Sequence, residues 1–303
     1  MSARALARAL ELARGPRLLC IVGPTASGKT DLALGVAEAV GGEIVSADSV
    51  QIYRGFDVGS GKPSREEIAR APHHLVDTHD PGDPVDAAGW ARLAEAAVED
   101  IRARGKIPIV CGGTFFWIRA LVLGLVEAPA ADAAVRARHK AIVDERGRAA
   151  LHDELARVDP PSARRLHPND TVRVSRALEV YELSGRTMSD WQAAHGFKTS
   201  RFDAALVALE HDPAKLTERI AARVDVWLAH GWIDEVRRLL DAGHGEARAM
   251  GSVGYAEVRA HVEGKLPRDE LRDAIVRSTR VFARRQRTWL NGTDQAHARV
   301  EWL

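Results

Sequence analysis

The residues best suited to chemistry stand in one short stretch, IVGPTASGKTDLA at positions 21–33. It fits the pattern G-x-x-x-x-G-K-[ST], in which backbone N–H groups and the lysine hold phosphates and the final hydroxyl reaches a bound Mg²⁺. The residues expected to hold the phosphates, with Thr30 also as the metal ligand, are Gly23, Pro24, Thr25, Ala26, Ser27, Gly28, Lys29 and Thr30. The motif predicts a class of ligand and leaves the reaction open.

A second candidate is Asp48, which follows the run EIVSA. A GTPase or ATPase needs an aspartate at a strand end to hold Mg²⁺ and also a residue that positions water. The polar stretch after Asp48, SVQIYRGFDVGSGKP, contains no recognisable guanine-reading or water-positioning signature. Three roles are therefore open to Asp48: a general base, a carboxylate that holds Mg²⁺ through water, or a helix cap.

Short apolar runs alternate with helical segments over the first 125 residues, and these elements must position the two candidates. The main strands are expected at 17–22, 43–48, 74–77 and 107–113, and helices at 30–40 and 87–105. Strands separated by helices predict an α/β fold with a doubly wound parallel sheet, which binds ligands at the carboxyl ends of its strands. The Gly-Gly-Thr turn at 112–114 would let a planar ligand approach the backbone closely.

The pattern changes to helix after helix between residues 124 and 200, and a strand pattern returns at 202–210. We expect three segments: the first part of a P-loop core at 17–123, a helical insertion at 124–200, and the completion of the core with C-terminal helices at 201–303. The amphipathic N-terminal residues, MSARALARALELARG, are expected to form a short helix that frays.

Composition limits the possible partners and compartments. The chain has 43 Lys and Arg against 42 Asp and Glu, so its formal net charge is +1 and nucleic acid must bind to a local patch. Cys20 and Cys111 lie in apolar runs, where buried thiols suited to a reducing cytoplasm are expected. The sequence has no run of 18 apolar residues, so no membrane span is expected.

Two further groups of side chains are candidate sites. The histidines at 73, 74 and 79 stand near Asp77 and Asp80, but their spacing matches no zinc pattern of ligand pairs. Four arginines share one face of the late helix and have no Asp or Glu in the surrounding residues 274–293: Arg277, Arg280, Arg284 and Arg287. We call these four the arginine stripe; it is either a solvated face or a boundary of an RNA-binding cleft.

Seven blocks, in order along nearly the whole chain, resemble the tRNA dimethylallyltransferases, also called tRNA isopentenyltransferases. The blocks are GPTASGKT (23–30), DSVQIYRGFDVGSGKP (48–63), APHH (71–74), GGT (112–114), HPNDTVRVSRALEV (167–180), VGY (253–255) and RRQRTWL (284–290). The second and fifth blocks are far more diagnostic than the phosphate loop, because many unrelated proteins share that loop.

The resemblance implies that the loop holds the diphosphate of dimethylallyl diphosphate. The five-carbon group then passes to the exocyclic amine of the adenosine just 3′ of a tRNA anticodon. The implied cofactor is Mg²⁺, the implied partner is tRNA, and the implied state is a monomer. Four residues receive catalytic roles: Asp48 as the base, and Lys29, Thr30 and Arg223 at the diphosphate.

The resemblance also implies which residues contact the tRNA. They are Asp48, Ser49, Val50, Gln51, Thr114, Arg136, Val172, Arg173, Val174, Ser175, Arg176, Gly251, Ser252, Val253, Gly254, Tyr255 and Ala256. Three departures from the family pattern accompany them. Ser60-Gly61 stands where Thr-Ala is common, the aromatic residues 115–117 follow Gly-Gly-Thr, and Ala256 stands where a basic residue is frequent.

Other functions are compatible with the phosphate loop alone. A small-molecule P-loop kinase would turn over ATP without tRNA. An adenylate isopentenyltransferase would use the same donor with a free nucleotide and would not need the helical insertion. A non-catalytic RNA-binding protein would leave Lys29 and Asp48 without a role. The insertion and its block HPNDTVRVSR favour the tRNA enzyme.

Overall fold

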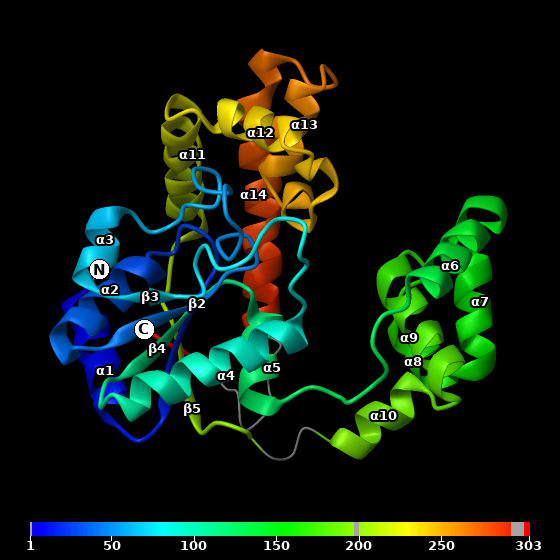
Figure 1. The fold of residues 1–303 in the computed structure, drawn as a ribbon, viewed down its shortest axis with the longest axis horizontal. Helices are drawn as coiled ribbons and strands as arrows, with labels where there is room; N and C mark the ends of the chain where they lie inside the picture. Colours follow the sequence, from blue (N-terminus) through cyan, green and yellow to red (C-terminus); the bar gives the residue numbers. More distant parts are fainter. Residues whose placement is uncertain (1, 197–199, 292–299) are drawn as a thin grey trace. The chain divides into compact units, whose positions relative to one another are not determined.

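The computed structural model describes residues 2–196, 200–291 and 300–303. The chain divides into two compact units (Figure 1). The first unit joins Met1–Leu123 to Ser200–Leu303, and the second is Gly124–Thr199.

A six-stranded parallel sheet forms the centre of the first unit. Its strands are β1 (Leu18–Val22), β2 (Glu43–Ala47), β3 (His73–His74), β4 (Pro108–Gly112), β5 (Ala204–Ala208) and β6 (Val300–Trp302). Their order across the sheet is β3-β2-β4-β1-β5-β6, and every pairing is parallel. The predicted α/β fold with a parallel sheet is confirmed. The strands β1, β2 and β4 are buried along their whole length, because helices cover both faces.

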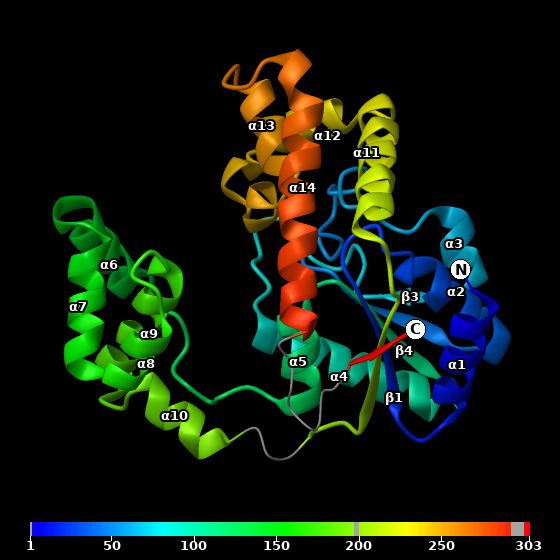
Figure 2. The same cartoon turned by 180° about the vertical axis from the view of Figure 1, so that it is seen from behind.

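Helices flank this sheet on two sides and continue beyond it. They are α1 (Ala3–Arg14), α2 (Lys29–Val40), α3 (Arg65–Arg70), α4 (Ala87–Ala103), α5 (Phe115–Leu123), α11 (Pro213–Ala229), α12 (Trp232–Asp241), α13 (Tyr255–Val262) and α14 (Arg268–Asn291), with 3₁₀ turns at His244–Glu246 and Arg248–Gly251. The opposite views of Figures 1 and 2 show α1 and α2 on one face of the sheet and α4 and α5 on the other. The helices α11 to α14 group together at the end of the sheet where the phosphate loop lies.

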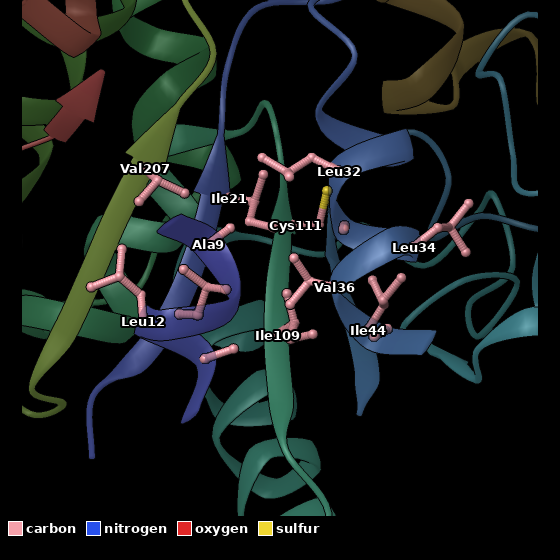
Figure 3. Packing of buried hydrophobic residues seen from close by; sticks show 14 of the residues in the cluster. Ala9, Leu12, Ile21, Leu32, Leu34, Val36, Ile44, Ile109, Cys111 and Val207 are labelled. Atoms are coloured by element: carbon pink, nitrogen blue, oxygen red, sulfur yellow. The ribbon is translucent and has the colours of Figure 1, made fainter. Parts of the chain in front are cut away.

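The main core lies between α1, α2 and one face of the sheet, as Figure 3 shows. Alternate strand residues such as Ile21, Ile109 and Val207 point into this core because successive side chains on a strand face opposite ways. Leu32 and Val36, one turn apart on α2, pack against them. This packing fixes the start of α2, and therefore the phosphate loop, relative to the strands.

The expected fraying of the N-terminal helix is wrong. The Ser2 hydroxyl accepts a hydrogen bond from the Ala5 N–H at 3.1 Å and caps α1. Arg8 forms an ion pair with Glu301 of β6 at 2.8 Å. The helix buries four side chains, Ala5, Ala9, Leu12 and Ala13. Tertiary packing therefore holds a helix that its length alone would leave marginal.

The strand predicted at 74–77 is also mostly wrong, because β3 contains only His73 and His74. Leu75 and Asp77 have φ angles of 61° and 55°, which an extended strand cannot contain. The Asp77 N–H instead donates to the Gln51 carbonyl at 3.1 Å. The segment leaves the sheet in order to pack on the loop that follows β2.

The second unit is helical, with no strand in its described residues. Its helices are α6 (Ala133–Arg146), α7 (Arg148–Val158), α8 (Pro160–Arg165), α9 (Thr171–Ser184) and α10 (Met188–His195). Its own core consists of Leu151, Leu155, Ala163, Val174, Ala177 and Leu178. A side-chain oxygen caps the start of α6, α8, α9 and α10.

In the part of the chain that the structure describes, no helix has both the length and the apolar character needed to cross a membrane.

Candidate active site

The phosphate loop joins the end of β1 to the start of α2. Ala26 and Gly28 adopt positive φ angles of 64° and 89°, so the backbone curls as an anion-binding loop does. No side chain of the described residues caps α2, whose N-cap is Gly28. The first N–H groups of α2 are therefore available to an anion, and the positive end of the helix dipole favours one. The Thr30 side chain lies exposed in the first turn.

Lys29 is the first residue of α2, and its side chain turns back over the loop. Its Nζ donates to the Pro24 carbonyl at 3.3 Å. Burial lowers the pKa of Lys29, and the nearby Arg223 guanidinium lowers it further. A bound anion would offset both effects, so the loop with its lysine is suited to a strongly charged ligand.

Arg223 reaches the phosphate loop from α11. A guanidinium N–H donates to the Thr25 hydroxyl, and the guanidinium carbon lies 4.5 Å from the centre of the Trp227 ring. Burial lowers the pKa of Arg223 to about 10, while the Asp48 carboxylate acts in the opposite direction. The structure thus places this arginine beside the loop, away from the solvated helix surface.

Two polar atoms near this loop are buried without a hydrogen-bond partner among the described residues. They are the Ser27 hydroxyl oxygen and the Arg223 Nε. Buried polar atoms normally find partners, because a missing hydrogen bond in a dry site costs about 1–3 kcal/mol. An anion seated on the loop would supply acceptors for both atoms.

Asp48 follows β2 at the carboxyl end of the sheet. Its Oδ1 accepts hydrogen bonds from the N–H groups of Val50 and Gln51 at 2.9 Å and 3.2 Å. The described residues donate no hydrogen bond to its Oδ2. The Gln51 side-chain amide donates to the carbonyls of Ser60 and Gly61, which ties the loop together. One carboxylate oxygen therefore orients the loop and the other is open to a ligand.

Thr114 joins the Gly-Gly-Thr turn to the residues around Asp48. Its hydroxyl accepts a hydrogen bond from the Ser49 N–H at 3.1 Å, and its own N–H donates to the Ala47 carbonyl at 3.1 Å. A Cβ on Gly112 would lie only 2.2 Å from that carbonyl oxygen, so the close approach of the two strand ends requires glycine there. The structure brings Asp48, Ser49, Gln51 and Thr114 together.

The segment 251–256 contributes exposed backbone and buried anchors. Gly251 and Ala256 are exposed, Ser252 and Val253 are half-buried, and Gly254 and Tyr255 are buried. The Tyr255 hydroxyl donates to Glu235 at 2.6 Å, so this side chain is engaged inside the protein. Contacts with a ligand must therefore come from the exposed members of the segment.

Glu235 on α12 is a residue that the sequence did not single out. Its side chain is buried and accepts hydrogen bonds from the N–H groups of Asp57 and Val58 at 3.0 Å and 2.6 Å, besides the Tyr255 hydroxyl. It thereby anchors the loop that continues from Asp48. In the sequence, Glu235 is marked only by its position on an otherwise apolar helix face. This pattern does not distinguish it from the many glutamates that are exposed.

In the second unit, α9 contains both exposed and engaged members of the predicted tRNA contacts. Val172 is 81% exposed and Arg173 is exposed, whereas Val174 is fully buried in the core. Ser175 is hydrogen-bonded to His139 at 2.8 Å. The side chains free to meet a ligand are therefore those at the start of the helix.

Arg136 and Arg176 both form ion pairs with Glu179, a carboxylate with no exposed surface. Arg176 also donates to the Pro129 carbonyl at 2.6 Å. Paired guanidinium groups lower the pKa of Glu179 against the effect of its burial, which is the larger single influence. The two arginines neutralise an internal charge, which the sequence resemblance did not indicate.

The arginine stripe lines a groove in the first unit. The groove has a volume of about 590 Å³, and α11 contributes apolar side chains such as Leu216 and Ile220 to its wall. Within residues 2–196, 200–291 and 300–303, none of the four arginines of the stripe forms an ion pair with a carboxylate. A concave surface with four arginines that no described carboxylate neutralises is suited to phosphate groups.

The donors at the phosphate loop fit Mg²⁺. Magnesium prefers oxygen ligands and commonly keeps waters and substrate phosphates beside one or two protein oxygens. The exposed Thr30 hydroxyl at the helix start is such an oxygen. Among the described residues no group of three or more His, Cys, Asp and Glu side chains could hold a metal, and His74 is instead hydrogen-bonded to Glu43 at 2.7 Å.

The sheet and its loop define a P-loop α/β protein with a carboxylate beside the loop. The profile of the family described as IPP transferase matches residues 51–293. The chain is 65% identical to a tRNA dimethylallyltransferase from Sorangium cellulosum (strain So ce56), over 93% of this chain and 90% of that protein. It therefore belongs to the IPP transferase family, as its sequence blocks predicted.

Further relatives agree with this assignment. A tRNA dimethylallyltransferase from Geobacter sulfurreducens is 46% identical over 95% of this chain and 91% of its own length. The crystal structure of full-length tRNA isopentenylpyrophosphate transferase from Bacillus halodurans matches with a TM-score of 0.69 and 34% identity, over 95% of this chain and 90% of that one. A eukaryotic dimethylallyltransferase acting on tRNA matches with a TM-score of 0.73 and 27% identity, over 91% and 70%.

Proposed function

We propose that this enzyme transfers a dimethylallyl group from dimethylallyl diphosphate to the exocyclic amine of the tRNA adenosine just 3′ of the anticodon. The observation that carries the proposal is the joint placement of three charges: Lys29 and Arg223 both donate to residues of the phosphate loop, and Asp48 follows β2 at the same carboxyl end of the sheet. Two cations there can hold a diphosphate, and one carboxylate can serve an amine. Membership of the family supports the choice of substrates.

The phosphate loop binds the donor. The N–H groups at the start of α2, together with Lys29 and Arg223, neutralise the charge that grows on the diphosphate as the allylic carbon–oxygen bond breaks. The electron pair of that bond leaves with the diphosphate. Thr30 would hold Mg²⁺, which when bound adds positive charge on the same side.

Asp48 serves the acceptor. The amine nitrogen forms the new bond to the allylic carbon and gives up a proton, which the Oδ2 of Asp48 accepts. The two N–H groups bound to Oδ1 keep the carboxylate in one orientation. Because a base stacked in the anticodon loop cannot reach this carboxylate, the adenosine must turn out of the loop before it reacts.

The tRNA contacts come from both units. In the first unit they are the backbone and side chains at 48–51, Thr114, and the exposed residues of 251–256. In the second unit Val172 and Arg173 at the start of α9 present an apolar and a cationic side chain to the anticodon arm.

The enzyme acts as a monomer in the reducing cytoplasm. Burial raises the pKa of Cys20 to about 12, which keeps this side chain a thiol.

Incubation with labelled dimethylallyl diphosphate and either bulk tRNA or AMP tests this function. We expect label in tRNA only, and we expect Lys29→Ala and Thr30→Ala to abolish its incorporation by weakening the donor side. Label in AMP would instead indicate an adenylate isopentenyltransferase. Steady ATP hydrolysis that both substitutions stop would indicate a P-loop kinase.

A further inference from the structure

Gln286 on α14 is a buried polar residue that forms hydrogen bonds to both halves of the proposed active site. Its side-chain Oε1 accepts a hydrogen bond from the Thr25 N–H at 3.0 Å. Its Nε2 donates to the Gly113 carbonyl at 2.9 Å. The residue is only 6% exposed, although its neighbours Arg285 and Arg287 on the same helix are exposed.

One of these bonds holds the donor side. Thr25 lies in the phosphate loop, and its hydroxyl receives the hydrogen bond from Arg223. The backbone N–H of the same residue is held by Gln286. The Gln286 amide thus ties the phosphate loop to α14.

The other bond holds the acceptor side. Gly113 precedes Thr114, whose hydroxyl accepts a hydrogen bond from the N–H of Ser49, the residue after Asp48. A Cβ on Gly113 would lie 2.6 Å from the Gln286 Nε2, so the turn and the amide are in direct contact. The same amide therefore also sets the position of the turn beside the general base.

At neutral pH the glutamine amide can make both bonds from one side chain, whereas an ionised carboxylate of the same length cannot. The amide offers an acceptor and two donors, whereas a carboxylate only accepts and a thioether does neither well. The helix itself is held in place near this point, because Trp289 stacks on Phe115 at a ring distance of 5.2 Å. A fixed helix whose amide side chain both accepts and donates is suited to set the distance between the phosphate loop and the Gly-Gly-Thr turn.

We propose that Gln286 is a positioning residue for the transfer reaction, which fixes the phosphate loop at a set distance from the Gly-Gly-Thr turn. This inference rests on the proposed function. Reacting groups must lie about 3–3.5 Å apart and aligned, and a misplacement of 1 Å can cost about 100-fold in rate. Gln286 touches neither reacting group, so its loss should slow the chemical step while both substrates still bind.

The test compares Gln286→Met, which removes both bonds at similar length, with Gln286→Glu, which keeps an acceptor for the Thr25 N–H and loses the donor to Gly113. Thr288→Ala, an exposed change on the same helix, is the control. Single-turnover transfer to tRNA, KM for both substrates and Tm are measured for each protein, at least 10 °C below the lowest Tm.

We expect Gln286→Met to lower the single-turnover rate about 30–100-fold while both KM values stay within threefold and Thr288→Ala matches wild type. The rate of Gln286→Glu should rise toward wild type as the pH falls, because a protonated carboxyl can donate to the Gly113 carbonyl. A purely structural role would not produce this recovery in rate at constant KM.

Three results would overturn the positioning role. They are a rate within threefold of wild type in both variants, a rise in both KM values equal to the fall in rate, and loss of folding in Gln286→Met while Gln286→Glu stays at full rate at every pH. In each case the wild-type enzyme still prenylates tRNA. Absence of tRNA labelling by wild type itself would instead contradict the proposed function.

Discussion

The two carboxylate oxygens of Asp48 differ: Oδ1 accepts hydrogen bonds from two N–H groups of the loop, and Oδ2 accepts none from the described residues. This division makes Asp48→Asn a selective change. The amide oxygen can still accept both backbone N–H groups, while the nitrogen in place of Oδ2 cannot accept a proton. The loop should keep its shape and the enzyme should lose its proposed base.

We therefore expect Asp48→Asn to lower the rate of prenyl transfer by about 100-fold to 10,000-fold, the usual range for a general base. The tRNA affinity should stay within about threefold, because the loop is unchanged. Quench-flow measurement of labelled tRNA and filter binding give the two quantities. Asp80→Asn, an exposed change near the same loop, is the control, and transfer within tenfold of wild type would exclude Asp48 as the base.

At the same scale, the sequence indicates some site residues and conceals others. The phosphate loop and Asp48 are visible because neighbours in the chain form the local motif. Gln286 and Glu235 act on residues far away in the sequence, so only the folded chain reveals them. Glutamine and glutamate are common on helices, and no spacing separates these two from exposed copies.

The helix α9 separates two arginines that look alike in the sequence. Arg173 lies exposed and, among the described residues, forms an ion pair only with Asp170, three residues earlier. Arg176 instead neutralises the buried Glu179. Arg173 can exchange Asp170 for a phosphate at little cost, since exposed ion pairs contribute at most about 1 kcal/mol to the free energy of unfolding. Removal of Arg176 leaves a buried carboxylate with one arginine fewer.

We expect Arg173→Ala to weaken tRNA binding and reduce the slope of log affinity against log salt by about one unit, with no change in Tm. Arg176→Ala should lower Tm by several degrees, because a buried ion pair loses a partner. Titrations in 50–300 mM salt and calorimetry measure these quantities. An unchanged salt slope in Arg173→Ala would show that the start of α9 does not meet the phosphate backbone.

The start of β2 is clamped to the end of α4 by charge. The Glu43 carboxylate is hydrogen-bonded to Arg104 and to His74. The distance from the Arg104 Nη2 to the Glu43 Oε2 is 2.8 Å. The Arg104 guanidinium lowers the pKa of Glu43 to about 2. A carboxylate whose folded pKa is below its unfolded value of about 4.3 stabilises the fold fully above that value. This contribution is lost as the pH falls toward 2.

For Glu43→Gln we expect a lower Tm at pH 7 and a smaller loss of Tm between pH 4.5 and pH 2 than in wild type. Thermal unfolding across that range measures both effects, and Glu99→Gln on the exposed face of α4 serves as the control. If Tm falls equally between pH 4.5 and pH 2 in Glu43→Gln and in wild type, this clamp does not contribute to the loss of stability in acid.

Over the whole molecule, a net charge of +1 means that tRNA must be attracted by gathered arginines and not by a general field. The arginine stripe in the groove between α11 and α14 is such a gathering. We expect Arg280→Ala with Arg287→Ala to reduce the salt slope of tRNA binding by about one to two units. Donor binding should be unchanged. A tRNA salt slope equal to that of wild type would leave the stripe as a solvated face.

The fold as a whole was largely predictable because alternating strand and helix patterns are local. The sequence could not show that β3 would stop at His74, since positive φ at Leu75 serves packing on a distant loop. Nor could it show that residues 3–14 would be held, because their support comes from α2 and from Glu301. Both errors arise where tertiary contacts override local preference.

The pairing of β1 with β5 along its whole length has a consequence for biosynthesis. β1 ends at Val22, but its partner is complete only at Ala208. At translation rates of about 5–20 residues per second, one edge of β1 therefore waits about 10–40 s for its neighbour. An unpaired apolar edge is a template for aggregation, whereas the intervening helices of the second unit form from local contacts during the wait. We therefore expect the ribosome-bound chain to pass through a stage in which helices of the second unit have formed while one edge of β1 is still unpaired.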